Sequence, residues 1–354
     1  MADGIRFEKH FQQSTFRNPM MGNQLDTQKV EIRTDPLTGQ KSLFNPRLED
    51  KVAIINPPSD LALIERQARE SEPKCFICGE RWKLTAPAYP DEIVPGGRVQ
   101  KGEAVLFPNL FPVYQVHAVI RVGERHYVPL AEFAVSDLHE AFLATGDFAR
   151  ALSRAALGVR FLTLNANYLG PAGASIAHPH FQVVGGDIPF NVLENLLARG
   201  GEYRRKFFSC YWTDLVEKEK ELGERYIGRT GTVDWLTSFS PAGTNEVLGI
   251  LPSRRELLEM DEEDWLGLAL GVSAVLKGYG SLGISTFNFG FLSGPLGSGD
   301  EAFRCQMRII SRQNVHENPR ADDYFMQKIL GNQLILNTPE FLATKFRAAF
   351  TAGA

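Results

Sequence analysis

The chain has 354 residues, of which 44% are hydrophobic and 23% charged, a composition that is typical of globular proteins and excludes collagen, coiled coil and extensive disorder. Its 38 basic and 42 acidic side chains give a net charge of −4, which provides no general attraction to nucleic acid or to an anionic membrane surface. The N-terminus lacks the apolar core of a signal peptide, no run reaches the ~18 apolar residues of a membrane helix, and four cysteines make no disulfide framework, so we expect a cytoplasmic protein.

The first half of the chain alternates between strand and helix patterns. Residues 1–28 are polar and predict an arm, and Asp35–Gln40, with Pro36 in second position and Gly39 near its end, predicts a hairpin tip. A helix is expected from Ser136, its N-cap, to Leu152. Strands are expected over 104–107, 116–122, 159–167 and 178–184, the last two being joined by a Gly-rich link over 170–175.

The same order recurs about 128 residues later. A helical, charged stretch over 190–225 leads to a strand over 247–251, a helix over 261–276 and strands over 284–292 and 303–311. We interpret this as a duplicated α+β unit of antiparallel sheets flanked by helices, although weak identity leaves a chance repetition as the alternative. The interpretation predicts an arm over 1–28, a first unit over 29–200, a second unit over 201–345 and a tail over 346–354.

The clearest functional signal is the segment Gly173–Gln182, GASIAHPHFQ. Alternate side chains of a strand face the same way, so His178, His180 and Gln182 are expected on one face. Three polar side chains in a row are costly to bury unless each has a partner. The preceding loop offers backbone N–H groups and the Ser175 hydroxyl to phosphate oxygens. The pattern therefore predicts a phosphate-handling site, whereas a single metal shared by both histidines, as in a cupin, would require a β-sandwich that the predicted helices disfavour.

A second signal is the pair Cys75 and Cys78, which has the spacing of half a tetrahedral zinc site. Neutral imidazoles are the usual complement of two thiolates, and His126 and His178 are the candidates. A redox-active CxxC and an incidental pair are the alternatives. A zinc ion with four protein ligands would be structural, and if it took His178 it would leave His180 free to attack phosphorus.

These residues and their order resemble the galactose-1-phosphate uridylyltransferase branch of the histidine-triad superfamily. The resemblance extends from about Arg33 to Ser311 and includes the DPLTGQ…NPR segment over 35–47, the CxxC, the Asn-Leu-Phe-Pro stretch over 109–112, His126 before a helix, Asn167 and the GxSxxHPHxQ motif over 173–182. A plain histidine triad has a third histidine where this chain has Gln182. Glutamine at that position is typical of transferases and phosphorylases rather than of hydrolases.

The resemblance implies a fold of two tandem histidine-triad-like units, the second degenerate, and ping-pong nucleotidyl transfer in carbohydrate metabolism. His180 would attack the α-phosphorus of a nucleotide sugar, expel a sugar 1-phosphate and pass the nucleotide to a second phosphate acceptor. By matching position, the zinc ligands would be Cys75, Cys78, His126 and His178; the phosphate contacts would be Asn167, Gly173, Ser175, Gln182 and an arginine near Arg47; and the nucleoside contacts would be Asn109 and Phe111. A homodimer that binds nucleotide sugars and sugar phosphates is also implied.

Departures from the family pattern bear on the substrate. Leu110 stands where uridylyltransferases carry an acidic residue near the ribose, and Phe181 replaces a glycine beside the nucleophile. Gln306 and Arg308 occupy positions where some relatives carry iron-binding histidines, so we expect no second metal. Two further functions stay open: a nucleotide phosphorylase that uses inorganic phosphate as acceptor and an ADP-sugar, GDP-sugar or dinucleoside polyphosphate as donor, and a non-catalytic nucleotide-binding protein.

Overall fold

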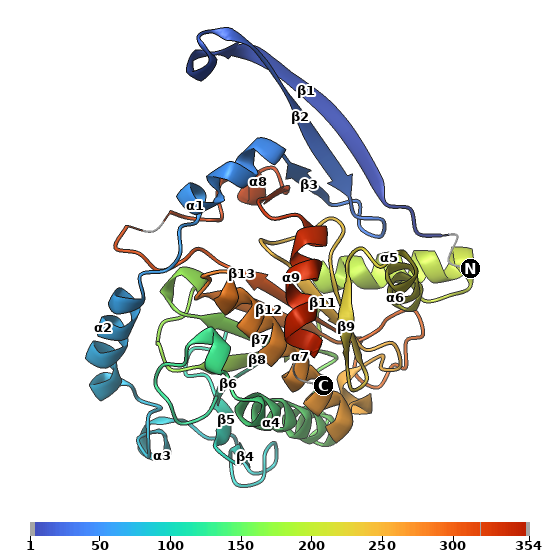
Figure 1. The fold of residues 1–354 in the computed structure, drawn as a ribbon. Helices are drawn as coiled ribbons and strands as arrows, with labels where there is room; N and C mark the ends of the chain where they lie inside the picture. Colours follow the sequence, from blue (N-terminus) through green and yellow to red (C-terminus); the bar gives the residue numbers. More distant parts are fainter. Residues whose placement is uncertain (1–3, 319, 352–354) are drawn as a thin grey trace.

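The computed structural model, which describes residues 4–318 and 320–351, is built around a ten-stranded antiparallel sheet (Figure 1). The strand order is β4-β5-β6-β8-β7-β12-β13-β11-β10-β9. The first five are β4 (Val99–Lys101), β5 (Ala104–Pro108), β6 (Val116–Arg121), β7 (Phe161–Tyr168) and β8 (His180–Gly186). The last five are β9 (Tyr226–Thr230), β10 (Val233–Thr237), β11 (Val247–Ile250), β12 (Phe287–Leu292) and β13 (Gln306–Ser311).

The predicted duplication is present in this topology. Each half contributes three strands, a long helix and two more strands, and the halves meet where β7 pairs with β12. The long helices are α4 (Val135–Arg154) and α7 (Glu262–Ser281). Helix α7 begins 127 residues after α4, and β12 and β13 each begin 126 residues after β7 and β8. The two units thus form one continuous sheet.

Helices cover the two faces of this sheet unequally. Helices α4 and α7 pack against each other and, with α9 (Pro339–Thr351), cover one face, where the main core lies. On the opposite face, α5 (Asn191–Phe207) and α6 (Tyr211–Leu222) cover the second half through a separate cluster that includes Trp212, Leu248 and Ile250. The same face of the first half carries α3 (Trp82–Thr85) and the segment before it. The second unit therefore has helices where the first unit has its candidate site.

Two details of the first half differ from prediction. Helix α4 begins at Val135 after Ala134, so Ser136 is not its N-cap, although Leu138, Phe142 and Leu152 are buried as expected. Strand β8 begins at His180, not at residue 178, and His178 lies in the bend before it. Pro179 explains the later start, because proline has no N–H to give to a ladder, although its carbonyl accepts from Val122.

The N-terminal region is a long hairpin that extends from the body of the molecule (Figure 1). Strand β1 (Glu8–Asn18) pairs with β2 (Gln24–Thr34), and β2 continues through the predicted Asp35–Gln40 turn into β3 (Lys41–Phe44). In that turn Gly39 has a φ of +75°, and Asp35 N–H donates to the Gln40 carbonyl. Strand β14 (Gln333–Ile335) pairs in parallel with β3.

The predicted boundaries of the arm, the two units and the tail require correction, because they fall inside helices or strands. The boundary after residue 28 falls inside β2, the one after 200 falls inside α5, and the one after 345 falls inside α9. The predicted tail is part of the core as far as it is described, because Phe346 and Phe350 lie on the buried side of α9. The shorter helices are α1 (Val52–Ile55), α2 (Leu61–Ser71) and α8 (Phe325–Lys328). Among the described helices, none has the length and apolar character needed to cross a membrane.

Candidate active site

Four side chains that the sequence predicts as metal ligands converge in the first half. Cys75 and Cys78 come from the turns between α2 and α3, His126 from the loop after β6, and His178 from the bend before β8. All four are buried, and their ligand atoms lie within 4.8 Å of one another. A zinc tetrahedron with bonds of about 2.0–2.3 Å places neighbouring ligand atoms roughly 3.3–3.8 Å apart, so the group fits a single ion.

The surroundings of these ligands also fit a cation. The Nδ1 atoms of both histidines lie 3.1 Å from the Cys78 Sγ, while their Nε2 atoms lie 3.2 Å from the Gly123 carbonyl (His178) and 2.9 Å from the Ser71 hydroxyl (His126). Such outer contacts fix the orientation of a ligating imidazole. Burial raises the pKa of Cys78 to about 12 in the absence of an ion and lowers that of His178 to about 4. Neutral histidines with thiols that need a positive charge to ionise are suited to a metal ion.

His180 lies beside this group but is not part of it. It opens β8 with 7% of its surface exposed, and its Nδ1 lies 2.9 Å from the backbone carbonyl of His178. Since a carbonyl oxygen only accepts, Nδ1 carries the proton and Nε2 keeps its lone pair. Burial lowers the pKa of His180, so the imidazole is neutral near pH 7. The ring lines a cavity of about 420 Å³, where a neutral Nε2 can act as a nucleophile.

The Gln182 side chain is hydrogen-bonded to a residue that is not among the predicted site residues. Its Oε1 lies 2.8 Å from Nε2 of His117, a buried side chain on β6. The Val113 N–H donates to Nδ1 of His117 at 3.4 Å, so Nε2 is the protonated nitrogen and donates to Gln182. The Asn109 side-chain nitrogen lies 3.2 Å from the same Nε2, and because both are donors it remains available to a ligand. A histidine in the otherwise apolar run 116–120 was the one sequence signal for this role.

The outer part of the cavity is apolar. Asn109, Leu110 and Phe111 line it together with Phe76, Ser175, Ile176 and Gln182. Leu110 and Phe111 are 66% and 82% exposed, which is unusual for such large apolar side chains. The Asn109 Oδ1 accepts from the Phe111 N–H at 2.9 Å and thereby shapes the loop. An exposed aromatic ring beside free amide donors is a suitable surface for a nucleobase and its ribose.

The Gly-rich loop connects β7 to His178 and carries the remaining predicted phosphate contacts. Ser175 lines the same cavity as His180, and Gly173 has a φ of +91°, which favours glycine. Asn167 lies near the end of β7, one residue beyond Ala166, which pairs with Phe181. A Cβ atom added to Gly173 would lie 3.8 Å from the Asn167 Nδ2, so this amide nitrogen faces the loop.

Three other residues singled out in the sequence lie elsewhere. Arg47 is exposed on the 3-10 helix η2 (Pro46–Lys51) and is not among the residues that line the His180 cavity. Gln306 is buried on β13, and Arg308 on the same strand lies 3.6 Å from the Glu246 carboxylate. The structure therefore brings together the predicted metal ligands and His180, with the nucleoside residues at the rim of the cavity. Of the other predicted contacts, Ser175 and Gln182 line this cavity, whereas Asn167, Gly173 and Arg47 are not among its lining residues.

Comparisons with known proteins identify both a relative and a shared fold. No family model matches the chain. A protein of Archaeoglobus fulgidus described as uncharacterized is 31% identical over 329 residues, which cover 93% of this chain and 94% of that protein. An ADP-glucose phosphorylase from Arabidopsis thaliana superimposes with a TM-score of 0.69 at 15% identity, over 90% of this chain and 98% of that one.

Two further solved structures share the fold. A GalT-like protein from Arabidopsis thaliana has a TM-score of 0.67 at 14% identity over 89% of this chain and 98% of its own. A uridylyltransferase mutant has a TM-score of 0.65 at 18% identity over 91% of this chain and 99% of its own. The expected α+β fold of two joined units is confirmed by these similarities.

Proposed function

The chain belongs to one family with the Archaeoglobus fulgidus protein and has the GalT-like fold, and from this premise we propose that it is a nucleotidyltransferase that forms a nucleotidyl-histidine at His180. The observation that carries the proposal is the position of the His180 ring, which lines the cavity with its Nδ1 proton bound by the His178 carbonyl. Two of the similar solved structures are an ADP-glucose phosphorylase and a uridylyltransferase mutant, and both names agree with transfer of a nucleoside monophosphate.

In the first step the Nε2 lone pair of His180 attacks the α-phosphorus of a nucleotide sugar. A P–N bond forms, the bond from phosphorus to the bridging oxygen breaks, and the electron pair leaves with the sugar 1-phosphate. The ring becomes cationic, and the hydrogen bond from Nδ1 to the His178 carbonyl strengthens as that charge develops. An acceptor phosphate oxygen then attacks the same phosphorus and returns the electron pair to Nε2.

The other predicted site residues have supporting roles in this proposal. The Gln182 amide group, with its oxygen held by His117, presents N–H donors to a phosphoryl oxygen and cannot act as an acid. Gly173 and Ser175 of the Gly-rich loop and Asn167 of β7 contact the phosphates, and Asn109 and Phe111 contact the nucleoside. A zinc ion on Cys75, Cys78, His126 and His178 would supply structural cross-linking that fixes the start of β8.

Intact-mass measurement of a covalent adduct tests the proposal. The protein is incubated separately with UDP-, ADP- and GDP-glucose, and we expect an acid-labile gain of one nucleoside monophosphate with one of them. The His180→Ala variant should form none, and the exposed His10→Ala variant serves as the control. The proposal fails if no donor gives an adduct or if the His180→Ala variant still forms it; absence of an adduct with nucleotide binding retained would indicate a binding protein.

The acceptor separates a uridylyltransferase-type reaction from a phosphorylase. The protein that carries the adduct is separated from the remaining nucleotide sugar. It is then mixed with inorganic phosphate, with glucose 1-phosphate or with galactose 1-phosphate. Loss of the adduct with a sugar 1-phosphate, together with formation of a nucleotide sugar, supports our first proposal. Loss with inorganic phosphate and release of a nucleoside diphosphate supports the phosphorylase.

A further inference from the structure

A chain of hydrogen bonds connects the second unit to the Gly-rich loop of the first. Asn288 on β12 is the register partner of Asn167 on β7, at the junction between the two halves. Its Nδ2 donates to the Asn167 Oδ1 at 2.7 Å and to the Ala172 carbonyl at 2.9 Å. Its Oδ1 accepts from Nη1 of Arg312 at 2.6 Å. One side chain of the second unit therefore contacts the loop, the neighbouring amide and a cation.

Only one assignment of donor and acceptor atoms is consistent with this series of hydrogen bonds. Arginine has five donors and no acceptor, so the Asn288 atom that contacts Arg312 must be the oxygen. The Asn288 nitrogen must then donate to Asn167, which makes the contacted Asn167 atom an oxygen as well. The Asn167 nitrogen is left on the other side, where it faces Gly173. Arg312 thus determines, through Asn288, which end of the Asn167 amide faces the loop.

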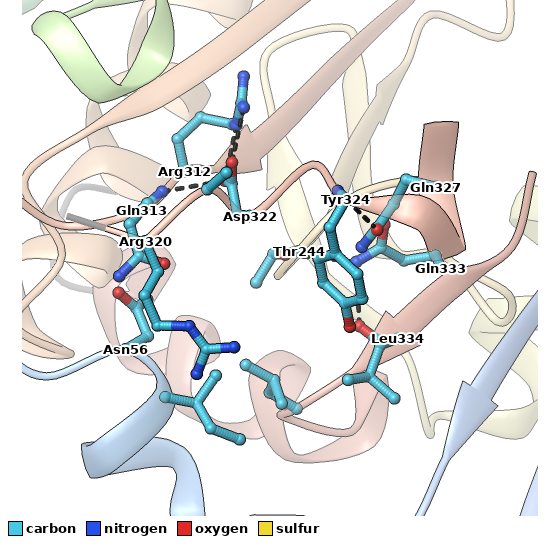
Figure 2. A pocket seen from close by; sticks show the side chains of 13 residues that line it. Asn56, Thr244, Arg312, Gln313, Arg320, Asp322, Tyr324, Gln327, Gln333 and Leu334 are labelled. Carbon is cyan, nitrogen blue, oxygen red and sulfur yellow. Dashed lines mark hydrogen bonds and ion pairs between the residues drawn. The ribbon is translucent and has the colours of Figure 1, made fainter. Parts of the chain in front are cut away.

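Arg312 is itself held in place by an acidic partner. Its Nε and Nη2 atoms each lie 2.7 Å from one of the two Asp322 carboxylate oxygens. Figure 2 shows this pair beside Gln313 at the edge of a small pocket that is lined mainly by the second unit, from which the guanidinium extends. A two-point contact between guanidinium and carboxylate fixes the orientation of both groups.

We propose that Asn288 is a positioning residue that keeps the Asn167 amide nitrogen directed at the phosphate group of a bound nucleotide. The inference rests on the proposed function for the location of that phosphate. A reversed Asn167 would present its oxygen to an anion and repel it, so the hydrogen bonds from Asn288 select the binding orientation. The second unit thereby acts on the phosphate site of the first unit.

The contribution of the phosphate to binding provides the test. Affinities of the full-length protein for uridine and UMP, adenosine and AMP, and guanosine and GMP are measured by calorimetry, and the ratio within the tightest pair is followed in variants. The isosteric Asn288→Asp substitution places an oxygen against the Asn167 oxygen and should turn that amide around. We expect the monophosphate to lose about tenfold in affinity, the value of one hydrogen bond to a charged group, while the nucleoside changes less than twofold.

A double-mutant cycle separates positioning from general damage. Asn167→Ala should cause the same loss, and Asn288→Ala combined with Asn167→Ala should cause no more than Asn167→Ala alone, because Asn288 acts through Asn167. The exposed Asn191→Asp variant is the control for the added negative charge. Additive losses, equal losses for nucleoside and monophosphate, or no monophosphate binding by the unmodified protein would overturn the inference. An absent covalent adduct with this binding pattern intact would overturn only the proposed function.

Discussion

At the scale of single residues, the reactivity of His180 depends on which of its nitrogens carries the proton. The His178 carbonyl accepts from Nδ1 and leaves Nε2 as the basic nitrogen, and His178 itself lies in the candidate metal group. The position of the His178 backbone and the orientation of the His180 ring are therefore linked, because His178 belongs to the candidate metal group and its carbonyl binds His180. Because burial of the ring lowers the pKa of His180, the neutral form is present throughout the physiological range.

The pH dependence of transfer follows from this shift. Protonation removes the Nε2 lone pair, so kcat/KM should decrease on the acid side as the free enzyme takes up a proton. The folded pKa is lower than the ordinary value of 6.5, so the midpoint of this decrease should lie below pH 6.5. Adduct formation measured at subsaturating donor between pH 4.5 and 8 checks this, and an acid limb centred at or above pH 6.5 would contradict it.

The contact between His117 and Gln182 gives a second prediction. His117→Phe keeps a ring of similar size but removes the donor to the Gln182 oxygen, which lets the amide rotate. We expect the rate of adduct formation at saturating donor to decrease about 5- to 100-fold, which corresponds to about 1–3 kcal/mol for a lost buried hydrogen bond. Rapid-quench measurement of the adduct gives this rate.

The control for His117 is the same substitution at His10, which is exposed on the hairpin. His117→Phe should also add little to the loss caused by Gln182→Ala, because both act on one amide. An unchanged rate would show that Gln182 keeps its orientation without His117. A fully additive loss would show that His117 acts on the reaction by another route.

Sequence could reveal some of these residues and not others for a physical reason. His180 and Gln182 alternate along one strand, and alternation alone places them on one face. The pairing of His117 with this strand depends on the register between β6 and β8, and that of Asn288 depends on the junction of β7 and β12. Strand order and register between distant segments are set by the assembled sheet. The supporting residues therefore became visible only in the structure.

At the scale of elements, apolar periodicity predicted the long helices and most strands of the central sheet, but it missed the hairpin strands and also β10, which is buried along its whole length. Strand β1 is exposed along almost its whole length and β2 is largely exposed over residues 24–29, so this part of the hairpin shows no alternation of polar and apolar residues. Helix α9 was missed, although its buried residues Leu342, Ala343, Phe346 and Phe350 have helical spacing. The segment between α2 and α3 contains little regular structure, and it carries two of the four candidate metal ligands, Cys75 and Cys78.

Metal loading should therefore control the order of that segment. Cys75→Ser removes one thiolate, and we expect the zinc content to decrease from about one ion per chain and the amides of residues 72–87 to exchange faster. Nucleotide affinity should decrease too, because Phe76, Thr85 and Pro87 line the His180 cavity. Elemental analysis and hydrogen–deuterium exchange measure these effects.

The matched control is Cys210→Ser, since Cys210 is also buried but lies in the cluster beneath α5 and α6. It should leave the zinc content and the exchange of residues 72–87 unchanged. Purified protein that holds no zinc yet protects residues 72–87 fully would show that packing alone orders the segment. Equal effects of both substitutions would show that the loss of a buried thiol, rather than of a ligand, is responsible.

At the scale of the whole molecule, the two units depend on each other. The main core includes Phe142 and Phe181 from the first half and Trp265 and Phe289 from the second. The Phe181 and Phe289 rings pack edge to face with centroids 4.7 Å apart across the junction of the sheet. A duplicated unit that had remained independent would have kept its own core. The homodimer implied by the family resemblance stays a prediction.

This shared core predicts that the chain unfolds in one transition, with both halves cooperating. Phe289→Ala creates a cavity against Phe142 and Phe181, and the free energy of unfolding should decrease by about 3–5 kcal/mol. Because the lost contacts belong to both halves, the whole transition should move to lower denaturant without splitting. Urea unfolding of the metal-loaded protein, followed by circular dichroism and by exchange of β5–β8 and β10–β13 amides, checks this. Separate midpoints for the two sets of strands would mean that each unit is stable without the other.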